Sequence, residues 1–517
     1  MPASFGPSHL FVSLSGPEPP RRYSGTTPWR TSEGDMFRIR ETLCGAAPEV
    51  VGRDRMEPPN ILIIMPDQLR ADALGCSGDP VVRTPNIDRL AGEGVRFTRT
   101  YTVSPICMSA RASFVSGLYP HNHHMWTNSG SLPAEDETFF HHLQRCGYYT
   151  ALIGKSHFYP HRGGHLKEHE GYMHARGLDY VYETTGPWAT VRTDSYMTDH
   201  WRREGLLEEF REDYERRRRI GPKAVWPSPL PVEEFLDSYV GRKAVEFLEN
   251  YDRGRPFCLF VGFGGPHPPW DAPGEYADIY SPDEVPAPIP IEKAGDWVPD
   301  YALGRMREGI VDASEGDFRR MKANYYGKVS LIDHWVGEIL RTLERRGWSE
   351  ETLVVFWSDH GEMLGDHGRL GKVVFYESSS LVPLMIRYPG RVPAGAVSDA
   401  LVEIVDLFPT FLEAAGVEPS ERCLGRSLWK VLERPDSGHR KAVFGEIFAS
   451  GSYNFMVRTD RYKYAMDDAG LGYMLYDLWA DPEERENLVG RRDMKEVEEE
   501  HRELILRFLV GNQMRLH

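Results

Sequence analysis

Cys107 and Arg111 stand four residues apart in the run SPICMSARAS, residues 104–113. Ser104 is suited to cap a helix and Pro105 to occupy its first position, which would place Cys107 in the first turn. There the positive end of the helix dipole favours a thiolate, and Arg111 lies on the same face one turn on. The spacing predicts a nucleophile beside an anion-holding cation. The alternative is that Cys107 is an ordinary buried thiol.

Other chemically useful side chains follow short apolar runs at residues 61–65, 148–153, 257–263 and 353–357. Such runs are typical of buried parallel strands, and functional groups of open α/β sheets gather at the carboxyl ends of strands. The residues at these ends, with one lysine shortly after the last of them, are Asp67, Gln68, Lys155, His157, His267, Asp359, His360 and Lys372.

Together these residues predict a metal and anion site. Asp67, Gln68, Asp359 and His360 would supply a hard, oxygen-rich site for Ca²⁺, Mg²⁺ or Mn²⁺. The lysines, Arg111 and the other histidines would hold a small tetrahedral oxyanion and stabilise its transition state. Taken singly, each has a structural alternative, since an aspartate after a strand commonly caps a helix and a lone lysine is normally solvated.

Several further motifs are weaker. The cluster of His121, His123 and His124 has no acidic neighbours in the sequence, so a structural loop is favoured. His141 and His142 are also interpreted as structural, while the tripeptide of residues 366–368 could line the same pocket as Lys372. The four arginines of residues 216–219 follow five acidic residues, which favours a solvated helix of mixed charge.

Composition excludes several classes of protein. The chain has 517 residues and a net charge of −16, which argues against nucleic acid as a partner. Its six cysteines form no CxxC pair, which argues against a structural zinc site and a disulfide framework. No apolar stretch reaches the length of a membrane span, and no signal peptide is recognisable, so a cytoplasmic enzyme is expected.

Strands that alternate with helices predict an α/β fold around a large, mainly parallel sheet sandwiched by helices. Helices are expected at residues 85–92 and 325–346, and residues 270–307 look like a long irregular excursion. From about residue 441 the texture changes to three strands of an antiparallel sheet and a helix at 494–515, which predicts a smaller C-terminal α+β subdomain. Residues 1–57 are rich in Pro, Gly, Ser and Arg and are interpreted as a disordered extension or a start-site artefact, leaving 58–440 as the catalytic domain.

The ordered set of motifs resembles the sulfatase family of the alkaline phosphatase superfamily. The resemblance runs from Asn60 to about Gly490. It rests on residues 60–68, 84–91, 107–121, 154–157, 266–268, 358–361, 371–372, 475–478 and 481–483. It implies the alkaline phosphatase-like fold and hydrolysis of sulfuric esters.

In that family the motif cysteine is oxidised to formylglycine, whose hydrate attacks sulfur. The resemblance implies that Cys107 is the nucleophile precursor and, with Asp67, Gln68, Asp359 and His360, a ligand of one divalent ion, expected to be Ca²⁺ with Mn²⁺ or Mg²⁺ as alternatives. Arg111 and Lys155 would steady the formylglycine and His157 would act as base. His267 and Lys372 would bind sulfate and assist the leaving group, and Asn128 would face the substrate. The implied partners are a small-molecule or saccharide sulfate ester and a formylglycine-generating enzyme, with neither nucleic acid nor membrane.

This sequence departs from the usual motifs of the family in two places. Ser109 holds the third motif position, where Pro or Ala is usual. Gln68 and His360 resemble the branch of choline sulfatases and phosphonate monoester hydrolases, yet Lys155 and His157 favour sulfate monoesters within it. A phosphonate or phosphate ester hydrolase and a non-catalytic pseudo-sulfatase are the alternatives.

Overall fold

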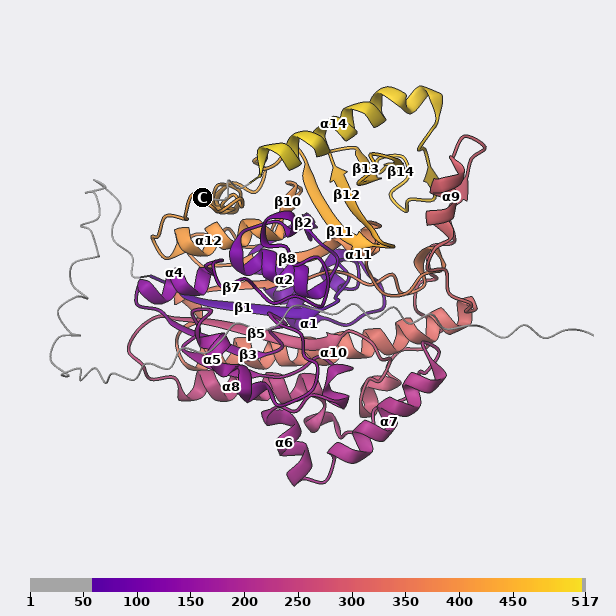
Figure 1. Ribbon diagram of the computed structural model, residues 1–517. Coiled ribbons are helices and arrows are strands. Elements are labelled where there is room, and N and C mark those ends of the chain that lie inside the picture. Colours follow the sequence, from indigo (N-terminus) through magenta and orange to yellow (C-terminus); the bar gives the residue numbers. More distant parts are fainter. Residues whose placement is uncertain (1–57, 514–517) are drawn as a thin grey trace, which may run out of the picture. The chain divides into compact units, whose positions relative to one another are not determined.

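The computed structural model describes residues 58–513, so the prediction for residues 1–57 lies outside the described residues. A nine-stranded sheet forms the centre (Figure 1). Strand β1 (Asn60–Asp67) lies between β5 (Phe257–Pro266) and β7 (Thr352–Trp357) and is parallel to both. The predicted α/β class with a mainly parallel sheet is confirmed.

The other strands extend the sheet on both sides. Beyond β5 come β3 (Tyr149–Gly154) and β4 (Tyr180–Glu183), both parallel to it. Beyond β7 come β8 (Leu381–Arg387) and β2 (Val95–Tyr101), and β2 also pairs with β9 (Ala396–Ser398) and β10 (Val402–Glu403). Only β8 among these nine strands runs antiparallel to its neighbours.

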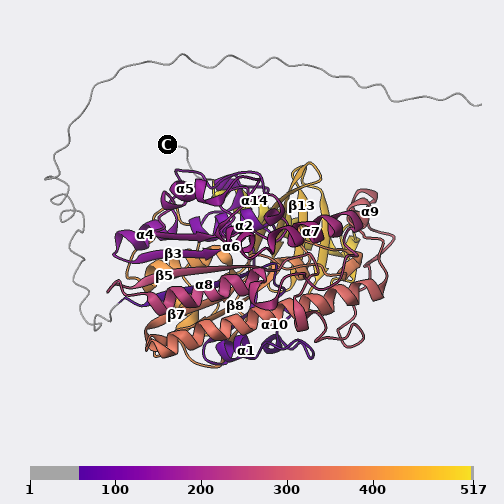
Figure 2. The same cartoon turned by 90° about the horizontal axis from the view of Figure 1, so that it is seen from below.

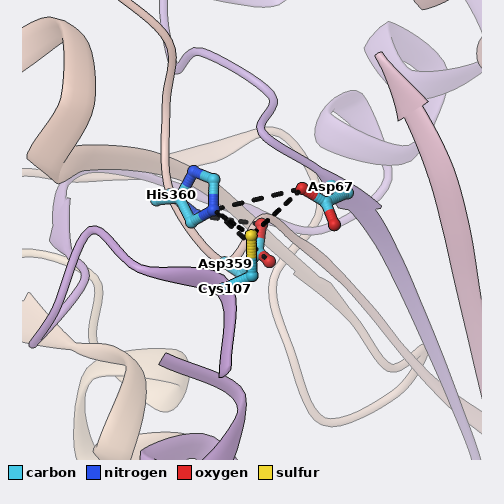
Figure 3. Close-up of side chains that lie close together, drawn as sticks. All are labelled: Asp67, Cys107, Asp359 and His360. Carbon is cyan, nitrogen blue, oxygen red and sulfur yellow. Dashed lines mark hydrogen bonds and ion pairs between the residues drawn. The ribbon is translucent and has the colours of Figure 1, made fainter. Parts of the chain in front are cut away.

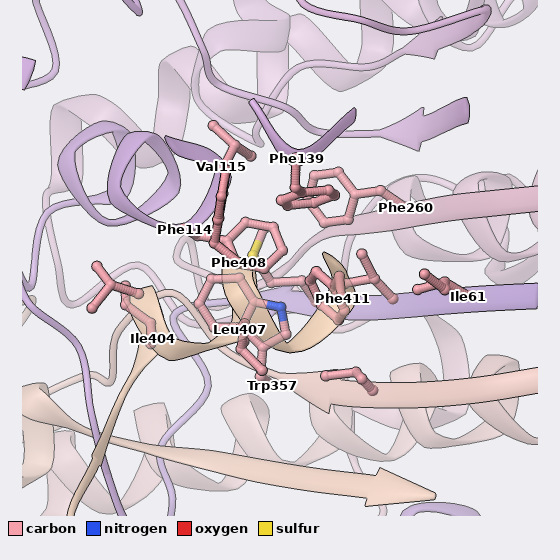
Figure 4. Close-up of a cluster of buried hydrophobic side chains, with 14 of the residues drawn as sticks. Ile61, Phe114, Val115, Phe139, Phe260, Trp357, Ile404, Leu407, Phe408 and Phe411 are labelled. Carbon is pink, nitrogen blue, oxygen red and sulfur yellow. The ribbon is translucent and has the colours of Figure 1, made fainter. Parts of the chain in front are cut away.

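Both faces of this sheet are buried. Side chains alternate along each strand, so successive residues enter the cores on opposite faces. In β1, Ile61 and Ile63 join one core cluster while Leu62 and Ile64 join another. Helices α2 (Cys107–Ser116), α4 (Phe139–Arg145) and α12 (Leu407–Ala414) cover the first face, with the aromatic cluster of Figure 4. Helices α1 (Pro85–Gly92), α8 (Leu236–Asn250) and α10 (Glu315–Arg345) cover the second (Figure 2). The continuous apolar runs follow from this double covering.

A four-stranded antiparallel sheet lies near the C-terminus. Its order is β11 (Val443–Ala449), β12 (Ser452–Arg458), β13 (Tyr462–Asp467) and β14 (Gly472–Asp477), and α14 (Lys495–Gly511) packs against it. The sequence predicted three of the strands and missed β14. A subdomain boundary near residue 440 stays a prediction.

Two predictions about individual elements were wrong. Helix α10 begins at Glu315, ten residues before the expected start, because Ser314 and Asp317 form a capping box there. The segment 270–307 is not irregular throughout, since its last eight residues form α9 (Asp300–Arg307). No helix within residues 58–513 is long and apolar enough to cross a membrane.

The remaining elements are short apart from α7 (Leu207–Ile220). They are α3 (Pro120–His123), α5 (Glu170–His174), α6 (Tyr196–Arg203), α11 (Glu377–Ser380), α13 (Trp429–Glu433), β6 (Lys293–Ala294) and β15 (Glu486–Asn487). The basic block at 216–219 lies at the end of α7 as predicted, but Arg217 is fully buried rather than solvated. Its guanidinium donates to the backbone carbonyls of Trp226, Pro227 and Trp270.

Candidate active site

Four side chains meet at the carboxyl edge of the central sheet (Figure 3). One ligand atom each of Asp67, Cys107, Asp359 and His360 lies within 4.8 Å of the other three, and all four residues are buried. Asp67 ends β1, Cys107 begins α2, and Asp359 and His360 follow β7. Parallel strands therefore bring together residues almost 300 positions apart, as the strand-end argument predicted.

Cys107 is in the first turn of α2, but the predicted cap was wrong. The helix begins at Cys107 itself with Ile106 as N-cap, and the Ser104 hydroxyl has no hydrogen-bond partner among the described residues. A residue far along the chain holds the backbone before the helix instead, since the Val373 N–H donates to the Pro105 carbonyl at 3.2 Å. The backbone N–H of Met108, in the first turn, donates to Asn128 Oδ1 at 3.1 Å, which places the Asn128 side chain at the start of α2.

Arg111 bridges the two carboxylates of the cluster. Its Nη2 lies 2.9 Å from Asp67 Oδ2 and its Nε 2.8 Å from Asp359 Oδ2, with all three side chains fully buried. Its Nη1 donates to the Lys155 carbonyl at 2.8 Å. The planar fork of a guanidinium suits this arrangement, which a single ammonium could not reproduce.

Lys155 brings a second cation to the same carboxylate, through an ion pair of its Nζ with Asp67 Oδ2. Burial raises the pKa of Asp67, but the positive charges of Lys155 and Arg111 hold that pKa well below its usual range. Asp67 is therefore ionised at neutral pH, with two cations beside it.

The same surrounding acts on the thiol. Burial and the charge of Asp67 raise the pKa of Cys107, but Lys372, His360 and Lys155 outweigh them, so the net shift is downward. His360 Nε2 lies 3.1 Å from Cys107 Sγ.

Gln68 lies beside the cluster and faces Lys372 and Glu362. Its Oε1 accepts from Lys372 Nζ and its Nε2 donates to Glu362 Oε2. Glu362 is fully buried and was not among the predicted residues. The available signal was its place in the same loop, three residues after Asp359.

Two of the predicted histidines, His157 and His267, lie where the neutral imidazole is favoured. Burial, reinforced by Lys155, lowers the pKa of His157 well below its usual value, and its buried Nδ1 has no partner among residues 58–513. Burial and the neighbouring Lys372 likewise lower the pKa of His267. The His267 Nδ1 donates to the Pro268 carbonyl at 2.7 Å, so Nε2 carries the free lone pair.

The weaker motifs contribute no ligand atom to this four-residue cluster. His121 Nδ1 pairs with Glu446 Oε1 at 2.5 Å, an acidic neighbour that is distant in sequence, and His123 Nε2 is 2.8 Å from Ser113 Oγ. His141 and His142 lie in α4, where His141 caps the helix start. In the tripeptide 366–368, Asp366 pairs with Arg70 at 2.7 Å and His367 stacks on Tyr376.

The donor set fits a divalent cation. Two carboxylates, a sulfur and an imidazole converge, and the His360 Nδ1 donates to the Gly361 carbonyl at 3.0 Å, which leaves Nε2 free as a ligand. Carboxylate oxygens favour hard ions such as Ca²⁺, Mg²⁺ and Mn²⁺.

The family model described as Sulfatase matches residues 59–417. The chain belongs to the sulfatase family. A second model, the C-terminal region of N-sulphoglucosamine sulphohydrolase, matches residues 365–509. As a sulfatase, the protein is a sulfuric ester hydrolase, and its fold is the alkaline phosphatase-like one that the sequence predicted.

Other sulfatases are similar over most of their length. An arylsulfatase of Clostridium perfringens is 31% identical, covering 88% of this chain and 95% of that protein. A choline-sulfatase of Rhizobium meliloti is 32% identical, covering 83% and 82%. Among solved structures, the phosphonate monoester hydrolase of Agrobacterium radiobacter superposes with a TM-score of 0.71 at 26% identity, covering 88% of this chain and 96% of that one.

Proposed function

We propose that this sulfatase cleaves a sulfate monoester to an alcohol and sulfate at the cluster of Asp67, Cys107, Asp359 and His360, with Cys107 as the precursor of formylglycine. One observation carries the proposal: a buried metal-type donor set that includes the motif cysteine is surrounded by Arg111, Lys155 and Lys372. Such a site attracts and holds a small oxyanion.

The same four residues, with Gln68 beside them, would hold one divalent ion, for which we propose Ca²⁺. The ion would polarise the sulfate oxygens, and formylglycine would supply the hydrated aldehyde as nucleophile. The donor atoms support the divalent ion, and the cationic surrounding of residue 107 supports formylglycine at that position.

The chain's own residues then divide the remaining work. Arg111 and Lys155 would keep the side chain at position 107 and the Asp67 carboxylate in place. His157, neutral because burial lowers its pKa, would accept a proton when sulfate is expelled. Lys372 would pair with the sulfate group.

His267 would serve the leaving group in a substrate-dependent way. Its free Nε2 is unprotonated while Nδ1 donates to the Pro268 carbonyl. A bound sulfate anion would raise the pKa of His267, so the imidazolium that protonates the leaving oxygen forms with the substrate in place. Asn128, whose Oδ1 accepts from Met108, would face the substrate through its other amide atoms.

A phosphonate or phosphate ester hydrolase is the second candidate. It is favoured by the superposition on the phosphonate monoester hydrolase of Agrobacterium radiobacter. Sulfate and phosphate esters share tetrahedral geometry, so the same cluster could hold either.

Matched substrates separate these two functions. Inorganic sulfate and phosphonate release should be measured with aryl, choline and sugar esters, using protein co-expressed with a formylglycine-generating enzyme. Peptide mass spectrometry across Cys107 should find formylglycine, and metal analysis should find one divalent ion per chain. Protein that carries formylglycine and metal but releases no sulfate would contradict the proposal, and faster phosphonate hydrolysis would favour the second candidate.

A further inference from the structure

A cavity of about 480 Å³ borders the candidate active site. Pro268, next to His267, and Gly371, next to Lys372, line it. A third wall comes from the loop after β4: a side-chain carbon at Gly186 would lie 3.0 Å from Lys155 Nζ, and two residues later Trp188 lines the cavity. Chain neighbours of site residues therefore line this cavity, into which the alcohol part of an ester would extend.

Three aromatic rings wall this cavity. Trp188 and Tyr214 pack edge to face with ring centroids 5.4 Å apart, and Trp270 stands on the wall next to Pro269. Trp188 is 38% exposed, so part of its ring is open to a ligand.

The polar atoms of two of these rings are engaged elsewhere. Trp270 Nε1 donates to the Pro222 carbonyl at 3.0 Å, and the Tyr214 hydroxyl donates to Asp271. Since Trp270 and Tyr214 are almost fully buried, the apolar surface that the cavity presents comes mainly from the ring of Trp188 and from neighbouring prolines. It has room for more than one fused ring, since pockets of this size hold drug-sized ligands.

Buried Arg217, itself a lining residue, connects the segments that form the wall. Its guanidinium donates to the carbonyls of Trp270 at 3.0 Å, Trp226 at 3.0 Å and Pro227 at 2.9 Å. The wall is thus held in shape before any ligand arrives, which lowers the entropic cost of binding.

Two exposed arginines line the cavity as well. Arg218 lies 3.4 Å from Glu215, whereas the Arg192 guanidinium makes no hydrogen bond or ion pair with any residue of 58–513. An unpaired cation beside apolar rings suits a ligand that has an aromatic body and an anionic group.

Other alcohols fit less well. The hydroxyls of a sugar ring need hydrogen-bond partners, and burying them against carbon walls is costly. Choline has a positive charge that the unpaired Arg192 would repel, although aromatic rings alone could attract it.

We propose that this cavity binds the leaving group, and that the preferred substrate is the sulfate ester of a fused-ring aromatic alcohol bearing a carboxylate or similar anion away from the ester. The substrate class rests on the proposed sulfatase function. Trp188 stacks on the ring system, and Arg192 pairs with the distal anion.

Binding of product-like probes tests the cavity without catalysis. By calorimetry at low salt, 6-hydroxy-2-naphthoate should bind at least fivefold tighter than 2-naphthol, which lacks only the carboxylate. Arg192→Ala should abolish this preference, while Trp188→Ala should weaken both probes about tenfold and Trp188→Phe restore most of the loss. Arg203→Ala and Trp479→Ala, exposed residues outside the cavity lining, should change neither. Equal affinities in the unaltered protein, or indifference to both cavity variants, would overturn the proposal.

Turnover distinguishes this proposal from the function on which it rests. Formylglycine-bearing enzyme should hydrolyse the sulfate of 6-hydroxy-2-naphthoate with a higher kcat/KM than 2-naphthyl, choline or glucosamine 6-sulfate. Release of sulfate from sugar or choline esters alone would leave the sulfatase function standing and overturn the substrate class. Tight probe binding with no sulfate released from any ester would mean that the sulfatase function had failed while the cavity still bound its ligand.

Discussion

Arg111 Nε lies 2.8 Å from Asp359 Oδ2, and both side chains are fully buried. The same guanidinium reaches Asp67 on its other side at 2.9 Å. One cation therefore connects the end of β1 to the loop after β7. Buried charges are tolerable only while they compensate one another, and here Lys155 supplies the second cation that balances the two carboxylates.

Replacing Arg111 should therefore be severely destabilising. Arg111→Ala leaves two carboxylates with only Lys155 to offset them, and we expect a loss of about 3–5 kcal/mol in the free energy of unfolding by urea. Arg111→Lys keeps the charge but cannot span both carboxylates, so its loss should be smaller yet clear. Arg203→Ala, an exposed arginine in α6, should stay within about 0.5 kcal/mol. An Arg111→Ala protein as stable as this control would refute the bridging role.

Glu362 should control activity through Gln68. Its carboxylate accepts from Gln68 Nε2, which turns Gln68 Oε1 towards Lys372 and the cluster. In Glu362→Gln an amide group can face Gln68 instead, so that Gln68 flips and presents its nitrogen to Lys372. We expect kcat to fall about tenfold with KM nearly unchanged, and divalent-ion affinity to fall 10–100-fold.

Metal content at limiting metal is the decisive measurement for Glu362, since a merely structural role would lower stability without lowering metal affinity. Glu315→Gln, at an exposed position of α10, serves as the control. Full metal affinity together with full kcat in Glu362→Gln would show that Gln68 keeps its orientation unaided.

Local sequence patterns predicted the fold and the gathering of the site well. Apolar runs such as residues 61–65 identify central strands because both sheet faces are covered, and strand ends then bring Asp67 and Asp359 to one edge. The start of α2 escaped prediction because Pro105 is held by a residue far along the chain, Val373, rather than by a local cap.

Residues whose role depends on a distant partner were the ones missed. Glu362 looks like any loop carboxylate until Gln68 is placed beside it. Arg217 lies in a run of charges that predicts solvation, yet carbonyls of the segments near Trp226 and Trp270 surround its guanidinium. His121 has no acidic neighbour in the sequence but meets Glu446 in the fold.

Ser109 offers a test of the unusual motif. It is fully buried in α2, and its hydroxyl has no hydrogen-bond partner among residues 58–513. Ser109→Ala removes this unsatisfied group and should raise the free energy of unfolding by about 1 kcal/mol. It also recreates the Cys-x-Ala-x-Arg pattern, so the formylglycine fraction at Cys107 should rise or stay complete.

A serine on the same helix is the matched control. Ser116 donates its hydroxyl to the Ala112 carbonyl at 2.7 Å, and Ser116→Ala should not stabilise the protein. A fall in formylglycine content in Ser109→Ala, measured by peptide mass spectrometry, would show that the maturing enzyme requires serine at this position.

Asp237 should make stability depend on pH. Its Oδ1 accepts from the N–H groups of Gly264 and Gly265 at 2.9 and 2.8 Å, just before His267, while its buried Oδ2 has no partner among the described residues. Burial raises the pKa of Asp237 from 3.8 to about 6, although Lys328 opposes the shift. The folded chain therefore binds a proton that the unfolded chain has already released between these two pH values.

This difference in protonation makes the folded protein less stable as pH rises. Stability contributed by protonated Asp237 is complete below about pH 4 and is lost as pH rises through about 6, a total of about 3 kcal/mol. Asp237→Asn keeps the acceptor for both glycines but has no charge to desolvate. Its stability relative to the unaltered protein should therefore grow by about 1 kcal/mol between pH 5 and pH 7, and level off above pH 7. Urea unfolding at each pH measures this, with the exposed Asp252→Asn as control. A difference that is constant across the range would mean that Asp237 is ionised throughout, and that the two glycine N–H groups suffice to hold its charge.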